Sequence, residues 1–257
     1  MFDSDAFHRT LFFPRRTTTP TPVGARDVGV DVPATTSAAH ATLQLRCHRP
    51  LGTRCTVLLF HGNGEVVADY DSAAAEFARA GAALAVVDYR GYGESTGEPT
   101  LRTVIGDAPL VVRALRAELG RREKLLVMGR SLGSACAIEI YGLGDDDDVA
   151  GVILESGFTD LGALIDRRRM PRPSAVTAAD RAVFDPIPKL TRGSLPLLVI
   201  HGSHDTLIAP AEASAAYAAA GGADKELVLL DGYGHNDVAA APEYWLALAA
   251  FVDRVCR

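Results

Sequence analysis

The 257-residue sequence predicts an α/β fold, with a mostly parallel central sheet flanked by helices and a short lid-like insertion. Two observations carry this prediction. Short unbroken apolar runs, each too short for a buried helix, alternate with Ala-rich segments of helical spacing. Gly, Asp or Ser occurs within two residues after each apolar run, as expected at the end of a strand. Such runs are typical of strands buried on both faces of a parallel sheet, and their alternation with helices favours right-handed crossovers.

The individual elements follow from these patterns. An early strand is predicted at 41–48, where leucines alternate with polar neighbours, after an irregular stretch at 14–39 that is rich in Thr, Pro and Ala. The apolar runs predict strands at 57–60, 82–87, 125–128, 152–154, 197–200 and 227–230. The segments of helical spacing predict helices at 69–80, 103–119, 132–142, 210–220 and 242–254.

Residues 158–194 interrupt the alternation with a segment that is too long and too rich in proline for a simple crossover. We expect it to lie over the carboxyl edge of the sheet as a lid, within one domain that spans residues 1–257. Its triple arginine, Arg167–Arg169, would favour anionic substrates such as acyl-CoA if it faced a site, and a solvated cationic face is the alternative.

The composition excludes several classes of protein. The formal net charge is −6, from 26 Lys and Arg against 32 Asp and Glu, which argues against a nucleic-acid partner. No stretch approaches the roughly 20 apolar residues of a membrane span, and no secretory signal is present. The four cysteines are scattered without a C-x-x-C pattern. We therefore expect a cytoplasmic protein without integral membrane association. The oligomeric state is left open.

Neither of two potential metal-binding groups has a ligand spacing that a known site would require. His40, Cys47, His48 and Cys55 match no zinc pattern. The acidic run at 145–148 lacks the alternating ligands and the Gly turn of a calcium loop. We therefore expect no metal and no cofactor.

The strongest chemical signal is at residues 129–133, which read Gly-Arg-Ser-Leu-Gly and match the pattern G-x-S-x-G. They follow a predicted strand directly and precede a predicted helix. In this context Ser131 would occupy a sharp, strained turn, so its neighbours two residues away must lack a bulky Cβ atom. The turn would expose the hydroxyl as a nucleophile close to the N-terminus of the helix, where aligned N–H groups stabilise an oxyanion. A tight turn with a helix-capping serine is the alternative.

A serine hydroxyl needs a base, and the order of the partners along the chain selects one histidine. After such a turn the expected order is Ser, then acid, then His. Four of the seven histidines precede Ser131, and His201 and His204 lie beside the candidate acid. His235 alone follows them all, in a Gly-rich loop after the last strand. Asp205, just past the strand at 197–200, is the preferred acid.

Two other carboxylates compete for the role of the acid. Glu155 ends the strand after the serine turn, and Asp160 follows shortly after it.

The oxyanion is expected to accept hydrogen bonds from two backbone N–H groups. One belongs to Leu132, and the other to Asn63 in the Gly-rich loop after the strand at 57–60, with Gly64 as the fallback donor. Tyr89 and Tyr92 follow the next strand and could line an acyl pocket, although plain packing explains them equally well. Gly64 and Tyr92 are thus candidate substrate-binding residues.

Together these motifs resemble the α/β-hydrolase superfamily from Thr56 to the end of the chain. Within it, the sequence resembles the branch of serine-aminopeptidase-like hydrolases and acyl-protein thioesterases, which remove palmitate from proteins. The resemblance implies a Ser131–Asp205–His235 triad. A serine nucleophile disfavours the dehalogenase and epoxide hydrolase branches, which use Asp. The segments that carry the resemblance are HGNGE (61–65), DYRGYGES (88–95), GRSLGSA (129–135), FDPIPKL (184–190), VIHGSHD (199–205) and GHND (234–237).

The leading functional hypothesis is a metal-free serine hydrolase that cleaves small-molecule or acyl carboxylic esters or thioesters through an acyl-enzyme. The first alternative is an aminopeptidase or amidase, which would need an acid such as Glu65 or Glu155 to bind the substrate amine. The second is a non-catalytic ligand-binding protein on the same fold. The sequence shows no Cys-rich N-terminal segment of the kind that attaches depalmitoylases to membranes, which weakens the case for a membrane-bound protein substrate.

Overall fold

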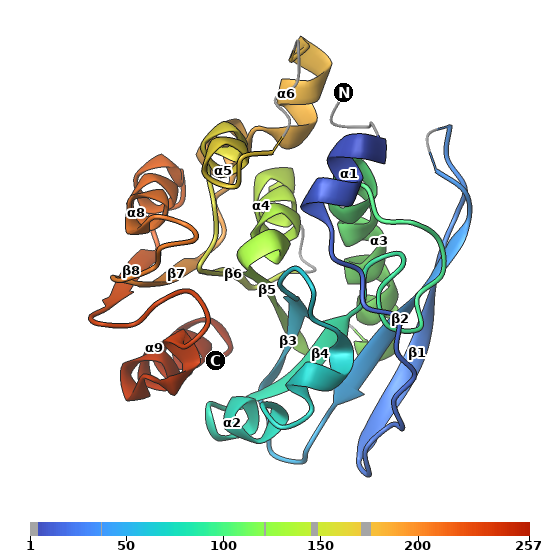
Figure 1. The fold of residues 1–257 in the computed structure, drawn as a ribbon. Coiled ribbons are helices and arrows are strands. Elements are labelled where there is room, and N and C mark those ends of the chain that lie inside the picture. Colours follow the sequence, from blue (N-terminus) through green and yellow to red (C-terminus); the bar gives the residue numbers. More distant parts are fainter. Residues whose placement is uncertain (1–4, 37, 121, 145–148, 171–175) are drawn as a thin grey trace.

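The computed structural model describes residues 5–36, 38–120, 122–144, 149–170 and 176–257. An eight-stranded sheet runs through the molecule in the order β1-β2-β4-β3-β5-β6-β7-β8 (Figure 1). The β1–β2 and β2–β4 pairs are antiparallel and every other neighbouring pair is parallel, which confirms the predicted α/β class. The strands are β1 (Ala25–Val32), β2 (Ala41–His48), β3 (Cys55–Phe60), β4 (Ala82–Val87), β5 (Lys124–Arg130), β6 (Gly151–Glu155), β7 (Leu197–Gly202) and β8 (Lys225–Leu230).

Helices cover both faces of the sheet (Figure 1). Helices α2 and α9 lie on one face, and α1, α3, α4 and α8 lie on the other. The helices are α1 (Asp5–Leu11), α2 (Ala74–Arg79), α3 (Leu101–Leu119), α4 (Ser134–Leu143), α5 (Leu161–Arg167), α6 (Ala178–Phe184), α7 (Pro186–Arg192), α8 (Pro210–Ala219) and α9 (Pro242–Val255). Three short 3-10 turns complete the set: η1 (Val67–Tyr70), η2 (Ser131–Gly133) and η3 (Val238–Ala240).

Strands β3 to β7 each contribute to two hydrophobic cores, because successive side chains point to opposite faces of a sheet. On β3, Val57 and Leu59 pack in the core beneath α2 and α9, whereas Leu58 and Phe60 pack in the core shared with α3 and α4. Burial on both faces explains why the strand sequences are apolar without interruption.

The two edge strands differ most from the sequence-based expectations. The stretch at 14–39 was expected to be irregular but contains β1, which pairs with β2. Its Val28, Val30 and Val32 alternate with polar residues, a signal that the high Thr and Pro content of the stretch obscured. At the opposite edge, β8 is not buried on both faces as expected, since Leu229 is exposed and residues 225–228 are only partly buried.

The single helix expected at 69–80 is divided into η1 and α2. The break contains Asp71, whose carboxylate binds Arg46 at 3.0 Å and His48 at 3.0 Å on β2. These tertiary contacts override the local helical pattern.

The insertion at 158–194 contains α5, α6 and α7, while its residues 171–175 lie outside the described part of the chain. Helix α7 packs closely against α4: a Cβ atom on Gly142 would lie 2.7 Å from the Cβ atom of Lys189. The ammonium group of Lys189 also forms an ion pair with Glu139 of α4 at 2.6 Å. Helix α7 is therefore part of the helical layer, and α5 and α6 remain as the candidate lid. Over the described residues, no helix has the length and apolarity needed to cross a membrane.

Candidate active site

The turn at Ser131 has the strained geometry that the G-x-S-x-G pattern predicts. Strand β5 ends at Arg130 and Ser131 has a φ of 50°, in the left-handed region that side chains other than Gly rarely adopt. A Cβ atom on Gly129 would lie 2.3 Å from the carbonyl oxygen of Gly133. A Cβ atom on Gly133 would lie 2.0 Å from the carbonyl oxygen of Phe60. The turn therefore requires both glycines, because backbone atoms fill the space that a side chain would occupy.

The structure brings Ser131, His235 and Asp205 together in one series of hydrogen bonds. The hydroxyl oxygen of Ser131 lies 3.0 Å from Nε2 of His235. Nδ1 of the same ring lies 2.7 Å from Oδ2 of Asp205. The three residues follow β5, β8 and β7, whose carboxyl ends meet at one edge of the parallel sheet, where α/β proteins commonly bind their ligands. The arrangement has the atom pairings of a nucleophile, a general base and an orienting acid.

Several groups in addition to His235 hold Asp205 as a carboxylate. Its Oδ1 atom accepts hydrogen bonds from the backbone N–H groups of Leu207 and Ile208, each at 2.8 Å. Its Oδ2 atom lies 3.0 Å from Nε2 of the buried His201 as well as close to His235. Burial raises the pKa of Asp205, but these hydrogen bonds outweigh burial and hold the pKa below its ordinary value.

The two competing acids have other partners. Glu155 accepts a hydrogen bond from Nε of Arg130 at 3.0 Å and another from the hydroxyl of Tyr244 at 2.7 Å. Asp160 caps α5 by accepting from the backbone N–H of Ala163 at 2.9 Å. Since both are engaged elsewhere, Asp205 is the acid that binds His235.

Both candidate oxyanion donors border the same small cavity as Ser131. Asn63 is fixed there by its side chain, because its Nδ2 atom donates to the carbonyl oxygen of Leu11 and its Oδ1 atom accepts from the backbone N–H of Phe13 at 3.0 Å. Leu132 is the first residue after the serine, within the 3-10 turn that leads into α4. This placement suits two N–H groups that converge on one oxygen atom.

The placement of Tyr92 corrects the expectation that it lines a substrate pocket. Tyr92 is fully buried, and its ring packs against His61 and Tyr89. Its hydroxyl donates to Oδ1 of Asn63 at 2.7 Å and accepts from the backbone N–H of Phe13 at 3.3 Å. Tyr92 thus supports the Asn63 side chain from behind. The roles of Gly64 as a substrate-binding residue and as the fallback oxyanion donor stay predictions.

The cavity at Ser131 is small. Its volume is about 20 Å³, which is room for about one water molecule. The N-terminal segment and α5 cover it. Besides Asn63, Ser131 and Leu132, its lining residues are Leu11, Phe158, Leu164, Arg168, Leu207 and Ile208.

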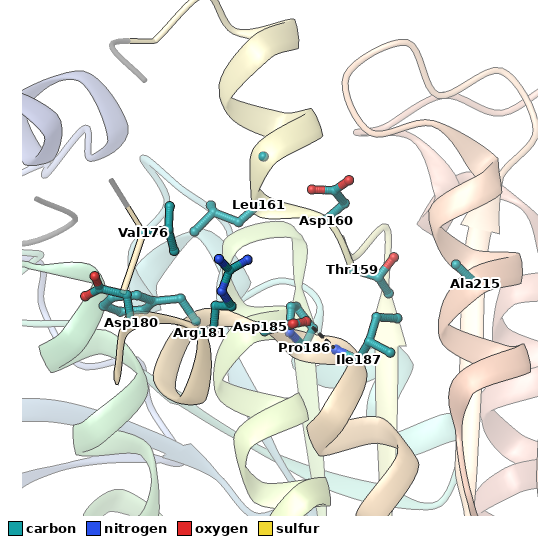
Figure 2. Close-up of a pocket in the computed structure, with 12 residues that line it drawn as sticks. Thr159, Asp160, Leu161, Val176, Asp180, Arg181, Asp185, Pro186, Ile187 and Ala215 are labelled. Atoms are coloured by element: carbon teal, nitrogen blue, oxygen red, sulfur yellow. Dashed lines mark hydrogen bonds between the residues drawn. The ribbon is translucent and has the colours of Figure 1, made fainter. Parts of the chain in front are cut away.

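A much larger pocket of about 520 Å³ lies between the start of α5, helix α6 and the start of α7 (Figure 2). Figure 2 shows Leu161, Val176, Pro186 and Ile187 around this space, with Arg181 projecting among them. A narrow hollow lies between the two spaces: it shares Phe158 with the cavity at the serine and Leu161, Phe184 and Pro186 with the large pocket.

The three arginines at 167–169 lie in different surroundings. Arg168 lines the cavity at Ser131 and its guanidinium lies over the ring of Phe13, 5.4 Å from the ring centre. Arg167 donates to the carbonyl oxygen of Leu207 at 3.2 Å, and Arg169 is exposed. One of the three charges is therefore placed where a substrate group could meet it.

Among the described residues, no group of three or more His, Cys, Asp or Glu side chains is arranged to hold a metal ion. The acidic run at 145–148 lies outside the described residues. The four cysteines are buried and free.

Sequence reasoning missed three contributors to the site. Arg130, the variable residue before the serine, contacts the end of β6 and two separate loops. His201 is a second histidine on the acid, and the N-terminal segment around Leu11 covers the cavity. Only the position of Arg130 within the G-x-S-x-G pattern could have drawn attention to it, because all its partners are distant in sequence.

Comparisons with known proteins show the family of the chain. The sequence matches the family described as serine aminopeptidase, S33, over residues 52–179 and 167–238. The alpha/beta hydrolase domain-containing protein aho-3 of Caenorhabditis elegans is 30% identical over 167 residues, which cover 65% of this chain and 47% of that protein. The alpha/beta hydrolase domain-containing protein 17C of Xenopus tropicalis is 29% identical over 207 residues, covering 79% of this chain and 63% of that protein. The chain thus spans about half to two thirds of the length of these curated relatives.

Solved structures show the same fold at low sequence identity. An esterase of Pyrococcus furiosus superposes with a TM-score of 0.74 at 20% identity, over 96% of this chain and 98% of that one. An esterase of Thermogutta terrifontis, solved with bound malate, superposes with a TM-score of 0.65 at 20% identity, over 90% of this chain and 100% of that one. With the family match extending over more than half of its length, the chain belongs to the serine aminopeptidase S33 family of α/β-hydrolases.

Proposed function

We propose that the protein is a serine hydrolase that cleaves carboxylic esters or thioesters through an acyl-enzyme intermediate. One observation carries the proposal: Ser131, His235 and Asp205 form a hydrogen-bonded series with separations of 3.0 Å and 2.7 Å. The strained φ of Ser131 is a second support, because backbone strain of this kind concentrates at functional sites.

The geometry suggests a role for each residue. The Ser131 hydroxyl attacks the substrate carbonyl carbon and its proton passes to Nε2 of His235, while Asp205 holds Nδ1–H of the ring and stabilises the imidazolium. The N–H groups of Leu132 and Asn63 stabilise the oxyanion, where one such donor contributes about 2.7–4 kcal/mol in the transition state. As the tetrahedral intermediate collapses, His235 returns the proton to the leaving alcohol or thiol. Water then attacks the acyl-enzyme by the same steps and releases the acid.

The aminopeptidase alternative is weaker, because both acids that could bind a substrate amine are already engaged. Glu65 pairs with Arg130 and accepts from the Tyr70 hydroxyl at 2.6 Å. Glu155 pairs with Arg130 and Tyr244 and is only 4% exposed. An amine would have to displace a guanidinium from either carboxylate. These contacts favour an ester or thioester, although the family description names a peptidase.

Small esters with an anionic group are the preferred substrates within this class, since Arg168 borders the cavity at Ser131. Because that cavity has room for about one water molecule, any acyl group would have to displace side chains that line it. The cytoplasmic location stays a prediction from the sequence.

The non-catalytic alternative is tested by the same experiment as the proposal. Turnover of p-nitrophenyl acetate, an acyl thioester and an amino-acid p-nitroanilide would be measured for the wild type, Ser131→Ala and His235→Ala. The matched control is Ser214→Ala, at an exposed serine on α8. We expect ester or thioester turnover to fall by at least about a thousandfold in both active-site variants and to be unchanged in the control. Equal turnover in Ser131→Ala would refute the proposal, and a wild type with no turnover of any substrate would favour a binding protein.

A further inference from the structure

Arg130 is the residue directly before the serine, and its side chain points into the protein, where 12% of it is exposed. All three nitrogen atoms of its guanidinium have a partner. Nε donates to Oε1 of Glu155 at 3.0 Å, and Nη1 donates to Oε1 of Glu65. Nη2 donates to Oδ1 of Asn236 at 2.9 Å.

Each of these partners belongs to a different segment of the site. The other carboxylate oxygen of Glu65 accepts from the backbone N–H of Gly62 at 2.6 Å, so Glu65 fixes the loop that carries Asn63. Asn236 directly follows His235 in the loop after β8. Arg130 therefore connects the serine turn to both the candidate oxyanion loop and the loop of the base.

Glu155 is the third partner of the Arg130 guanidinium. It ends β6, next to β5 in the sheet, and its second oxygen accepts from the hydroxyl of Tyr244 on α9. The Tyr70 hydroxyl donates to Glu65 in the same way. Burial raises the pKa of both tyrosines, so their hydroxyls stay protonated and remain donors. One cation, two carboxylates and two hydroxyls thus form one continuous series of contacts.

The planar fork of an arginine side chain is well suited to hold several acceptors in fixed directions, whereas a lysine supplies a compact charge at the end of a flexible stem. The contacts of Arg130 lie 65 and 106 residues away in sequence at Glu65 and Asn236. The two loops have no shared strand, since one follows β3 and the other follows β8.

We propose that Arg130 is a positioning residue: it sets the spacing between the serine turn, the oxyanion loop and the histidine loop, through Glu65 and Asn236. This inference rests on the proposed function. Arg130 acts through the residues it holds and does not touch the reacting atoms. A purely structural arginine would stabilise the fold without changing the turnover of folded molecules.

The test compares Arg130→Lys, Asn236→Ala and the double variant with the wild type. The control is Arg254→Lys, because Arg254 also bridges two carboxylates, Asp224 and Glu226, but lies on α9 away from these loops. The readouts are kcat and KM for p-nitrophenyl acetate, the rate of labelling by a fluorophosphonate, and the thermal unfolding midpoint.

We expect kcat to fall by about tenfold to a hundredfold in Arg130→Lys, because sub-ångström displacements of reacting groups have effects of this size, while KM changes by less than about twofold. Asn236→Ala should lower kcat by about tenfold with an unchanged unfolding midpoint, since its side chain is exposed. In the Arg130→Lys background, loss of Asn236 should have little further effect, because both changes break the same contact.

Three outcomes are decisive. A lower unfolding midpoint in Arg130→Lys, with kcat unchanged per labelled site, would overturn the inference and leave Arg130 as a structural residue. Additive losses of kcat in the double variant would also overturn it. A wild type that neither turns over ester nor reacts with the fluorophosphonate would overturn the proposed function itself, and the positioning role with it.

Discussion

Asp205→Asn tests the role of the acid with the smallest change of shape. Asn retains an oxygen that can accept from the backbone N–H groups of Leu207 and Ile208, which now bind Oδ1 at 2.8 Å. The amide nitrogen then replaces Oδ2, which lies 2.7 Å from Nδ1 of His235. An N–H donor at this place forces Nδ1 to accept, so the ring proton moves to Nε2, which can no longer accept the proton of Ser131.

The expected loss follows from this change of tautomer. In serine proteases the same substitution lowers kcat by about 10⁴-fold, which corresponds to about 5.5 kcal/mol of activation free energy. We expect a loss of about 10³-fold to 10⁴-fold in ester turnover and in the rate of fluorophosphonate labelling, at equal folded concentration. The labelling rate is measured from the intact mass of samples quenched at successive times. Circular dichroism confirms that the variant is folded.

Asp231→Asn is the matched control, because Asp231 is an exposed acid on the same edge of the sheet whose carboxylate accepts from Ser203 at 3.1 Å. Its labelling rate should match the wild type. A labelling rate within tenfold of the wild type in Asp205→Asn would refute the reasoning, and Glu155→Gln would then be the next variant to measure.

The lowered pKa of Asp205 adds a prediction about stability. A carboxyl group with a lowered folded pKa stabilises the fold above its unfolded pKa, near 3.9, and this contribution is lost as the pH falls toward the folded pKa. The difference in free energy of unfolding between the wild type and Asp205→Asn, measured by urea unfolding, should therefore narrow from about pH 5 to about pH 3. A constant difference over this range would contradict the assigned direction of the shift.

Two further predictions concern the turn and the cavity. Gly133→Ala should destabilise the protein by about 1–3 kcal/mol or more in urea unfolding, because its Cβ atom would overlap the carbonyl oxygen of Phe60. Gly106→Ala on α3 is the control: the space around its Cβ position is open, so the change should be neutral or slightly stabilising. Equal effects of the two substitutions would contradict this account. Arg168→Gln should lower kcat/KM for the anionic p-nitrophenyl hydrogen glutarate, relative to kcat/KM for the neutral p-nitrophenyl pentanoate, by about tenfold, as expected for the loss of one charge-assisted hydrogen bond. Arg169→Gln, at an exposed residue, should leave this ratio unchanged. An unaltered ratio in Arg168→Gln would refute the preference for anionic substrates.

Much of the fold could be predicted because burial on both faces of a parallel sheet leaves a local signature in sequence. Strands β3 to β7 appear as apolar runs for this reason. Edge strand β1 lacks that signature, since one of its faces is largely solvated. The division of the helix at 69–80 depends on Asp71 binding two residues of β2, which local patterning does not record.

The residues of the site likewise include some that the sequence could predict and others that only the folded structure reveals. Ser131, Asp205 and His235 could be chosen because each follows a predicted strand and their order along the chain is constrained. Tyr92 also follows a strand, yet its side chain turns inward to Asn63, and strand position alone does not decide that direction. The role of Arg130 depends on contacts with the end of β6 and with two distant loops, which only the folded chain brings together.

The central claim is that Ser131 is a nucleophile activated by His235, and covalent labelling tests it most directly. The purified protein would be treated with a fluorophosphonate, and the intact mass and the modified peptide would be measured. The account predicts a single adduct on Ser131 that is lost in His235→Ala. An adduct on another residue, or labelling of Ser131 that proceeds equally well in His235→Ala, would contradict it.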